Sequence, residues 1–161
     1  ISFSVFSQTS TKEQKESLHQ HCRWALEYHK PLSLHTRESI DDAIALISEY
    51  EGTGIKGVFH CFTGTVRQAE EIIKMGFYLG IGGVLTFKNS VLYKVIKDID
   101  PDFIVLETDS PYLAPAPYRG KRNESAYLRI IAEKLATIQN KSVESIAEIT
   151  TRNALKIFSP G

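Results

Sequence analysis

The sequence has few cysteines and no long hydrophobic run. Cys22 and Cys61 are its two cysteines and form no CxxC pair, so no disulfide framework is predicted. No apolar stretch approaches the roughly 20 residues that span a bilayer, and no signal-peptide pattern is present. We therefore expect a protein of the reducing cytoplasm with no membrane partner.

An excess of charge of either sign is also missing. Lysine plus arginine and aspartate plus glutamate each number 19, which gives a formal net charge of zero. This balance argues against wholesale coating of nucleic acid or membranes, although a local basic patch could still bind phosphate. With 42% hydrophobic and 24% charged residues, the composition is that of an ordinary globular protein. We expect one domain over residues 1–161.

Several catalytic motifs are absent as well. The sequence contains no GxSxG elbow, Walker loop or dinucleotide-binding fingerprint. Ser110 is not flanked by a histidine that would serve as its base. Cys61 follows His60 directly, and adjacent residues of a strand face opposite sides, which disfavours a Cys–His nucleophile.

The pattern that is present is an alternation of apolar strands and amphipathic helices. We expect strands at 31–36, 56–62, 77–84 and 101–109, and helices at 9–30, 38–52, 65–76, 90–100, 124–140 and 142–158. Four such strand–helix units after a leading helix predict a parallel sheet with helices outside.

The number of strands suggests part of a larger architecture. Four parallel strands alone would leave open edges, and a closed (β/α)₈ barrel takes about 250 residues. The fold class we expect is therefore α/β, the second half of a TIM barrel followed by C-terminal helices. The opening "ISFSVFSQTS" lacks methionine and starts within a pattern, so we expect a truncated or partly ordered chain.

Three polar residues stand at the predicted strand ends. His35 ends the first strand, His60 nearly ends the second, and Asp109 ends the last. Functional groups of parallel α/β folds gather at the carboxyl ends of strands, and two imidazoles with a carboxylate suit Zn²⁺ or a related divalent ion. Glu107 lies two residues before Asp109 on the same side of its strand. It could support a ligand through a hydrogen bond.

Plainer interpretations stay open for each histidine. A single histidine at a strand end is more often a hydrogen-bonded structural residue, and only the combination with Asp109 favours a metal site. The remaining three, His19, His21 and His29, lie on or beside the first helix and are expected to be surface or packing residues. His19 and His21 are two positions apart and do not share a helical face.

The segment 113–125 carries a basic cluster just after Asp109. Its cations are Arg119, Lys121 and Arg122. Basic side chains beside a metal site could hold phosphate oxygens. Alternatively, the segment is a solvated loop in which Asn123 or Ser125 caps the next helix.

Two further features have more than one explanation. Arg37 is either another phosphate contact or a salt bridge at a helix start. The segment "GIGGVLTFKNS" at 80–90 has three glycines where its strand turns outward. Missing side chains there allow something to approach the backbone closely, and tight strand packing explains them equally well.

Five segments together resemble a known family. In order they are "LHTRES", "GVFHCFTGT", "GFYLGIGGVLTFKNS", "VLETDSPYLAPAPYRGKRNES" and "ITTRNALKIF". They closely resemble the TatD family of metal-dependent deoxyribonucleases, within the amidohydrolase-like TIM barrels, from about Gln14 to Phe158. The piece "ETDSPYLAP…RGKRNE" is the most specific.

This resemblance implies a barrel with a divalent-metal centre (Zn, Mg or Mn) that hydrolyses DNA phosphodiesters, commonly from the 3′ end. His35 and His60 match two histidine ligands, and Asp109 matches the aspartate that binds metal and helps to activate water. Glu107 matches a supporting position. The matching basic loop of Arg119, Lys121 and Arg122 would contact the substrate, single-stranded DNA or 3′ ends.

The sequence also departs from the family. Family members begin with a strand bearing a His-x-His pair and later carry a metal-bridging glutamate, and neither occurs here. "HQH" at 19–21 sits in a helical pattern. We therefore expect little nuclease activity from this chain alone. Two alternatives are a related barrel hydrolase of a small ester, lactone or amide, and a non-catalytic fragment that binds metal weakly or serves as a folding or interaction module.

Overall fold

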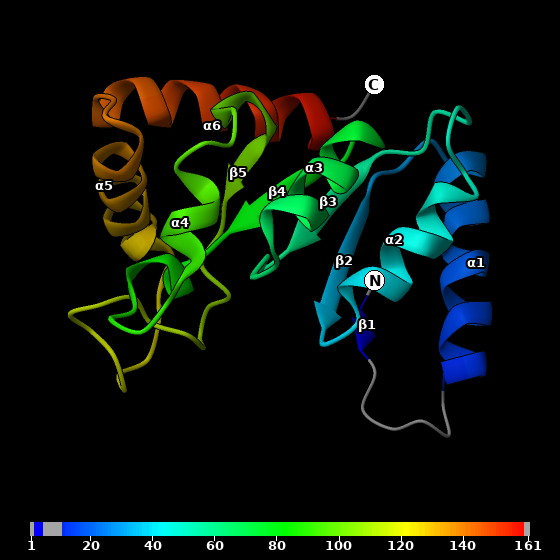
Figure 1. The fold of residues 1–161 in the computed structure, drawn as a ribbon, viewed down its shortest axis with the longest axis horizontal. Helices are drawn as coiled ribbons and strands as arrows, with labels where there is room; N and C mark the ends of the chain where they lie inside the picture. Colours follow the sequence, from blue (N-terminus) through cyan, green and yellow to red (C-terminus); the bar gives the residue numbers. More distant parts are fainter. Residues whose placement is uncertain (1, 5–10, 160–161) are drawn as a thin grey trace.

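A computed structural model describes residues 2–4 and 11–159, and its centre is a parallel sheet. The five strands lie in sequence order (Figure 1) and are β1 (Ser2–Ser4), β2 (Leu32–Arg37), β3 (Gly57–His60), β4 (Tyr78–Ile81) and β5 (Ile104–Leu106). Every neighbouring pair is parallel. The predicted parallel α/β architecture and its four strands are confirmed. β1 was not predicted, because three residues are too few to show a period.

The helices follow the predicted alternation, with shifted ends. They are α1 (Thr11–Glu27), α2 (Ile40–Ser48), α3 (Val66–Lys74), α4 (Leu92–Ile96), α5 (Leu128–Gln139) and α6 (Val143–Phe158), with 3₁₀ turns η2 (Gly83–Thr86), η3 (Pro101–Phe103) and η4 (Ser125–Tyr127). The last strand starts later than predicted because Asp100 caps η3, accepting the Asp102 N–H at 3.0 Å. Local side-chain caps of this kind compete with strand pairing.

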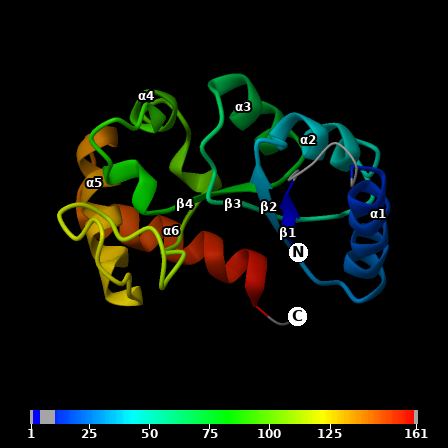
Figure 2. The same cartoon turned by 90° about the horizontal axis from the view of Figure 1, so that it is seen from below.

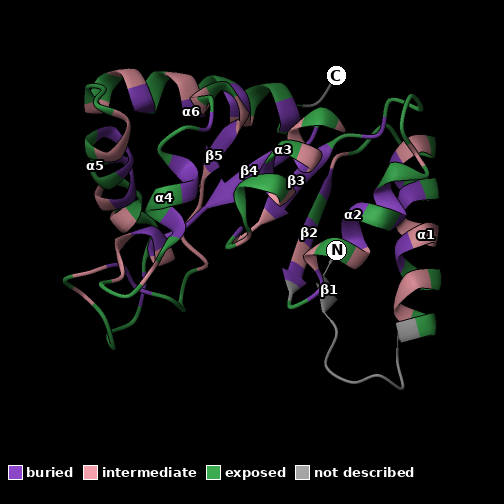
Figure 3. Cartoon of the chain, viewed as in Figure 1, coloured by how far each residue is buried: buried purple, intermediate pink, exposed green. Residues whose placement is uncertain are grey.

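The main core lies between one face of the sheet and the helices that cover it. Figure 2 shows α2, α3 and α4 on this face. Leu34, Phe59, Leu79 and Ile104 project from four adjacent strands and are fully buried. Burying each of these side chains contributes about 1.5–3 kcal/mol to stability. This contribution strongly favours the one orientation of each strand in which these residues face the core. Figure 3 shows the buried residues concentrated on the strands and on the helix sides that face them.

A smaller cluster occupies the opposite face. Val58, Tyr78 and Val105 pack there against Ile157 of α6. α6 crosses this face near the amino-terminal ends of the strands (Figures 1 and 2), where Asn153 Nδ2 donates to two carbonyl oxygens, those of Pro101 and Ile104, both at 2.8 Å. The carboxyl ends of the strands therefore lie at the edge away from α6.

No helix in the described part of the chain is both long enough and apolar enough to cross a membrane.

Candidate metal centre

Two histidines stand side by side at the carboxyl edge of the sheet. His35 and His60 are register partners on β2 and β3. Their ring centroids lie 5.5 Å apart with planes tilted by 37°, and both residues are partly buried. Because the strands are parallel and in this register, the two predicted strand-end histidines share one face.

A glutamate from β5 holds the second histidine. Glu107 directly follows β5, and its Oε2 lies 2.6 Å from His60 Nδ1. Its other oxygen, Oε1, accepts the backbone N–H of Cys61 at 2.6 Å. The hydrogen bond to Glu107 raises the pKa of His60, burial opposes that rise, and the charge of Asp109 adds to it. Glu107 thus fixes both the ring and the backbone at the end of β3.

Asp109 faces the other side of the same imidazole. Its Oδ1 lies 3.3 Å from His60 Nε2. Asp109 has φ 55° and Cys61 has φ 50°, a left-handed conformation that is uncommon outside glycine. Residues held in such conformations concentrate at functional sites, where the surrounding structure compensates the strain. Both residues are held here by backbone hydrogen bonds. The Cys61 N–H donates to Glu107 Oε1, and the Asp109 carbonyl oxygen accepts from the Tyr112 N–H at 2.8 Å.

The glycine of β4 makes room for the glutamate. A Cβ at Gly80 would stand 2.5 Å from Glu107 Oε2 and 3.2 Å from His60 Cα. The close approach predicted at the glycine-rich segment is therefore made by a carboxylate of the same chain. A Cβ at Gly82 would lie 3.5 Å from Glu107 Oε1, an ordinary contact.

The charges and lone pairs of His60 and Asp109 fit a cation. When Nδ1 donates to Glu107, Nε2 presents a lone pair. That lone pair faces a carboxylate oxygen at 3.3 Å, so two acceptors face each other unless a proton or cation lies between them. Two ligands of a tetrahedral zinc ion with bonds of about 2.0–2.1 Å would be separated by about the same distance.

The described residues bring together two candidate ligands, His60 and Asp109, and leave a third candidate, His35, beside them. Within residues 2–4 and 11–159, no three His, Cys, Asp or Glu side chains gather closely enough to hold a metal ion by themselves. His35 neighbours His60 through ring contact and does not close a three-ligand cluster with Asp109.

The predicted basic loop lies on an aromatic support. The Arg119 guanidinium stacks over the Phe87 ring, 3.7 Å from its centroid, and Lys121 Nζ lies 5.9 Å from the ring centroid of Tyr118. The three loop cations are exposed. Stacking uses the flat face of a guanidinium and leaves its N–H edge for an anion. The side chain of Arg37 lies outside the part of the chain that the structure describes.

Asn123 has a role that the sequence did not reveal. It is 1% exposed, and its Nδ2 donates to the backbone oxygens of Thr108 and Tyr112. It therefore anchors the segment around Asp109 and does not cap α5, whose N-cap residue is Tyr127 and has no side-chain cap hydrogen bond. An asparagine among charged loop residues gives no sequence signal of burial.

The histidines of the first helix lie elsewhere, as predicted. His19 Nδ1 lies 2.8 Å from the Tyr50 hydroxyl, and the His21 ring packs edge-on against Trp24 with centroids 5.1 Å apart. Both belong to α1, so "HQH" is helical and is no strand-borne ligand pair.

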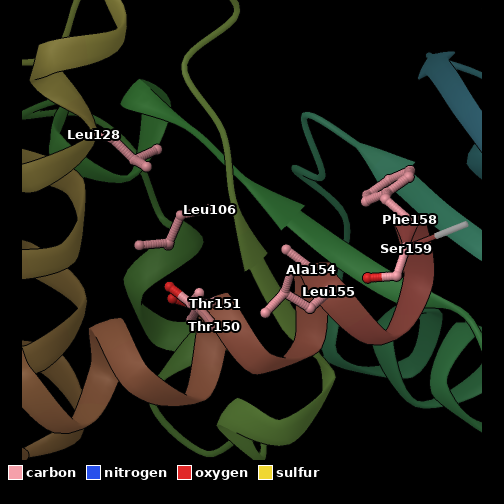
Figure 4. Close-up of a pocket in the computed structure, with 8 residues that line it drawn as sticks. All are labelled: Leu106, Leu128, Thr150, Thr151, Ala154, Leu155, Phe158 and Ser159. Atoms are coloured by element: carbon pink, nitrogen blue, oxygen red, sulfur yellow. The ribbon is translucent and has the colours of Figure 1, made fainter.

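An apolar cavity lies apart from this centre. It has a volume of about 430 Å³ and opens between β5, α5 and α6 (Figure 4), lined among others by Leu106, Leu128, Ala154 and Phe158. Its lining residues include none of His35, His60, Glu107 and Asp109.

Parallel strands with histidine and carboxylate groups near their carboxyl ends are typical of metal-dependent barrel hydrolases, and comparison with known proteins places the chain in such a family. The family model of TatD-related DNases matches residues 4–159. The chain therefore belongs to the TatD-related family of metal-dependent hydrolases, as its motifs predict.

Individual relatives support the assignment. The chain is 41% identical over 146 residues to the uncharacterized metal-dependent hydrolase YabD of Bacillus subtilis, covering 90% of this chain and 57% of YabD. It is 37% identical over 152 residues to the metal-dependent hydrolase YcfH of Escherichia coli K12, covering 94% of this chain and 57% of YcfH. The chain thus spans little more than half the length of these relatives.

A solved structure confirms the fold. The TatD homologue YjjV of Escherichia coli K12 superposes with a TM-score of 0.92 at 23% identity. The match covers 100% of this chain and 62% of YjjV. The predicted relation to part of a TatD-type TIM barrel is confirmed.

Proposed function

We propose that this chain belongs to a nuclease that hydrolyses phosphodiester bonds of DNA, trimming single strands from the 3′ end. The observation that supports this most is the facing pair of His60 Nε2 and Asp109 Oδ1, 3.3 Å apart, beside a loop with three exposed cations. The pair suits a divalent cation, and the loop suits the phosphates of a polyanion.

Each residue has a proposed part in the reaction. His60 and Asp109 would hold the cation, and its binding would have to draw in His35, which neighbours His60 on the adjacent strand without by itself closing a three-ligand cluster among the described residues. A bound divalent cation would polarise the phosphodiester and lower the pKa of a water molecule. Asp109 accepts the proton of that attacking water and orients its oxygen for in-line attack. Glu107 keeps the lone pair of His60 Nε2 directed at the centre.

The basic loop provides affinity for the DNA backbone. Arg119, Lys121 and Arg122 neutralise phosphates, so binding should weaken as salt rises. Because Arg119 is already stacked on Phe87, less side-chain freedom is lost when its N–H edge meets a phosphate.

The chain by itself should be a weak catalyst. It covers 57% of YabD, and the His-x-His strand and the bridging glutamate implied by the family resemblance do not occur in its sequence. We expect cleavage of end-labelled single-stranded DNA with Mg²⁺ or Mn²⁺ to be far slower than with a full-length family member that cleaves the same DNA under the same conditions. Equal activity of the two proteins would show that those missing residues are dispensable.

A loop variant tests the substrate class. Arg119→Gln, Lys121→Gln and Arg122→Gln are combined, and DNA binding and cleavage are compared with hydrolysis of a small neutral ester. We expect the triple variant to lose DNA binding and most of the salt dependence. A chain that hydrolyses the ester, ignores DNA and is unaffected by the triple change would instead be a small-molecule hydrolase.

A further inference from the structure

Tyr112 is the most exposed of the large hydrophobic side chains that the structure describes, at 72%. Among residues 2–4 and 11–159, no hydrogen bond, ion pair or ring contact engages its side chain. The apolar surface of an exposed aromatic ring is in contact with water. Stacking against another ring would bury that surface.

The backbone that carries this ring is held from both sides. The Tyr112 N–H donates to the carbonyl oxygen of Asp109 at 2.8 Å, and the Tyr112 carbonyl oxygen accepts from Asn123 Nδ2 at 2.6 Å. Asn123 is itself buried at 1% exposure. The ring is thus exposed while the backbone of Tyr112 is held in place. Stacking a partner on the ring would therefore cost this chain little additional backbone freedom.

The position of Tyr112 points to a nucleic-acid partner. It stands three residues after Asp109 and at the start of the segment that carries Arg119, Lys121 and Arg122. Single-stranded nucleic acids are bound by this combination, in which cations follow the phosphates and aromatic rings stack on the bases. We propose that Tyr112 is the platform on which a nucleobase stacks beside the phosphodiester held at His60 and Asp109. The inference rests on the proposed nuclease function.

Other tyrosines are less suited to this role. Tyr118 and Tyr127 stack on each other with centroids 4.4 Å apart and planes 3° from parallel, so one face of each ring is already covered. Tyr28 is 60% exposed, but it precedes β2 and lies at the opposite ends of the strands from Asp109. Tyr28 is therefore a matched control.

The test separates the base from the backbone of the ligand. Fluorescence anisotropy with the 161-residue chain measures binding of a labelled oligothymidylate and of an abasic deoxyribose-phosphate chain of equal length, in EDTA so that nothing is cleaved. Tyr112→Ala should weaken oligothymidylate binding about fivefold or more, the lower end of the effect of base–aromatic stacking, and leave abasic binding unchanged. Tyr112→Trp should retain oligothymidylate binding, and Tyr28→Ala should leave both ligands unaffected.

Two results would overturn the inference, and they differ. If the wild-type chain binds oligothymidylate and Tyr112→Ala changes binding of both ligands equally or of neither, Tyr112 is no base platform, while the nuclease proposal stands. If the wild-type chain binds neither ligand at any salt concentration, in EDTA or with Mg²⁺ added, the proposed function fails and the stacking role fails with it.

Discussion

Nδ1 of His60 lies 2.6 Å from Oε2 of Glu107. This contact links the end of β3 to the residue that follows β5, on the face of the sheet that carries the candidate metal centre. The same carboxylate accepts the N–H of Cys61. The tautomer of a histidine is set by the hydrogen bond of its other nitrogen. Glu107 therefore determines which atom of His60 faces Asp109, without itself facing the centre.

Glu107→Gln tests this positioning role. The new amide would keep its oxygen on Cys61 and present N–H groups to His60 Nδ1, which would move the ring proton to Nε2 and block the metal-facing lone pair. We expect the affinity for Zn²⁺ or Mn²⁺, measured by isothermal titration calorimetry, to fall about 10–100-fold. Glu133→Gln is the control, because Glu133 pairs with Arg129 at 2.9 Å on the exposed side of α5. Equal affinity in both variants would contradict the role of Glu107.

Gly80→Ala and Gly82→Ala form a matched pair. A Cβ at position 80 would lie only 2.5 Å from Glu107 Oε2 and would therefore push the carboxylate away. A Cβ at position 82 would have its nearest neighbouring atom at 3.5 Å, an ordinary contact distance. We expect Gly80→Ala to lower the free energy of unfolding by about 1–3 kcal/mol, as overpacking does, and to weaken metal binding. Gly82→Ala should change stability by no more than about 0.5 kcal/mol. Urea unfolding and metal titration of both variants provide the measurements, and indistinguishable variants would refute the packing argument.

Asn123→Ala should loosen the segment around Asp109. The change removes the donor to the Thr108 and Tyr112 carbonyl oxygens, both in partly buried hydrogen bonds. We expect the free energy of unfolding to fall by about 1–3 kcal/mol, with faster amide hydrogen exchange at Tyr112. Asn89→Ala, at an exposed position, should have little effect. A loss of the same size at position 89 would remove the special role of Asn123.

Cys22 should make stability depend on pH in the alkaline range. Burial raises the pKa of its thiol to about 11. The unfolded chain loses this proton at a lower pH than the folded chain. Below about pH 9 the protonated thiol therefore makes its full contribution to the free energy of unfolding. This contribution declines by up to about 2–3 kcal/mol as the pH rises toward about 11. Urea unfolding of wild type and Cys22→Ala over this range should show a shallower decline for the variant. Parallel curves would exclude the effect.

Several features of the centre could be predicted from the sequence because they depend on local pattern and strand direction. Short apolar segments that alternate with amphipathic helices identified β2 to β5, and parallel strands must end at a common edge, so His35, His60 and Asp109 are expected near one another. The structure confirms that His60 approaches both neighbours. Period-2 alternation predicted only that Glu107 lies on the side of Asp109, where it could support a histidine; the structure ends β5 at Leu106 and brings Glu107 to His60.

The sequence by itself determined the strand and helix alternation, the family motifs and the residue types at the strand ends, because period, capping and spacing act over a few residues. The tertiary structure alone decided that Glu107 clamps His60 and Cys61, that Gly80 leaves space for this carboxylate, and that Asn123 is buried beneath the Asp109 segment. Glu107 lies 47 positions from His60 and 46 from Cys61, and Asn123 lies 15 positions from Thr108. These contacts depend on strand register and side-chain packing, which no local pattern encodes.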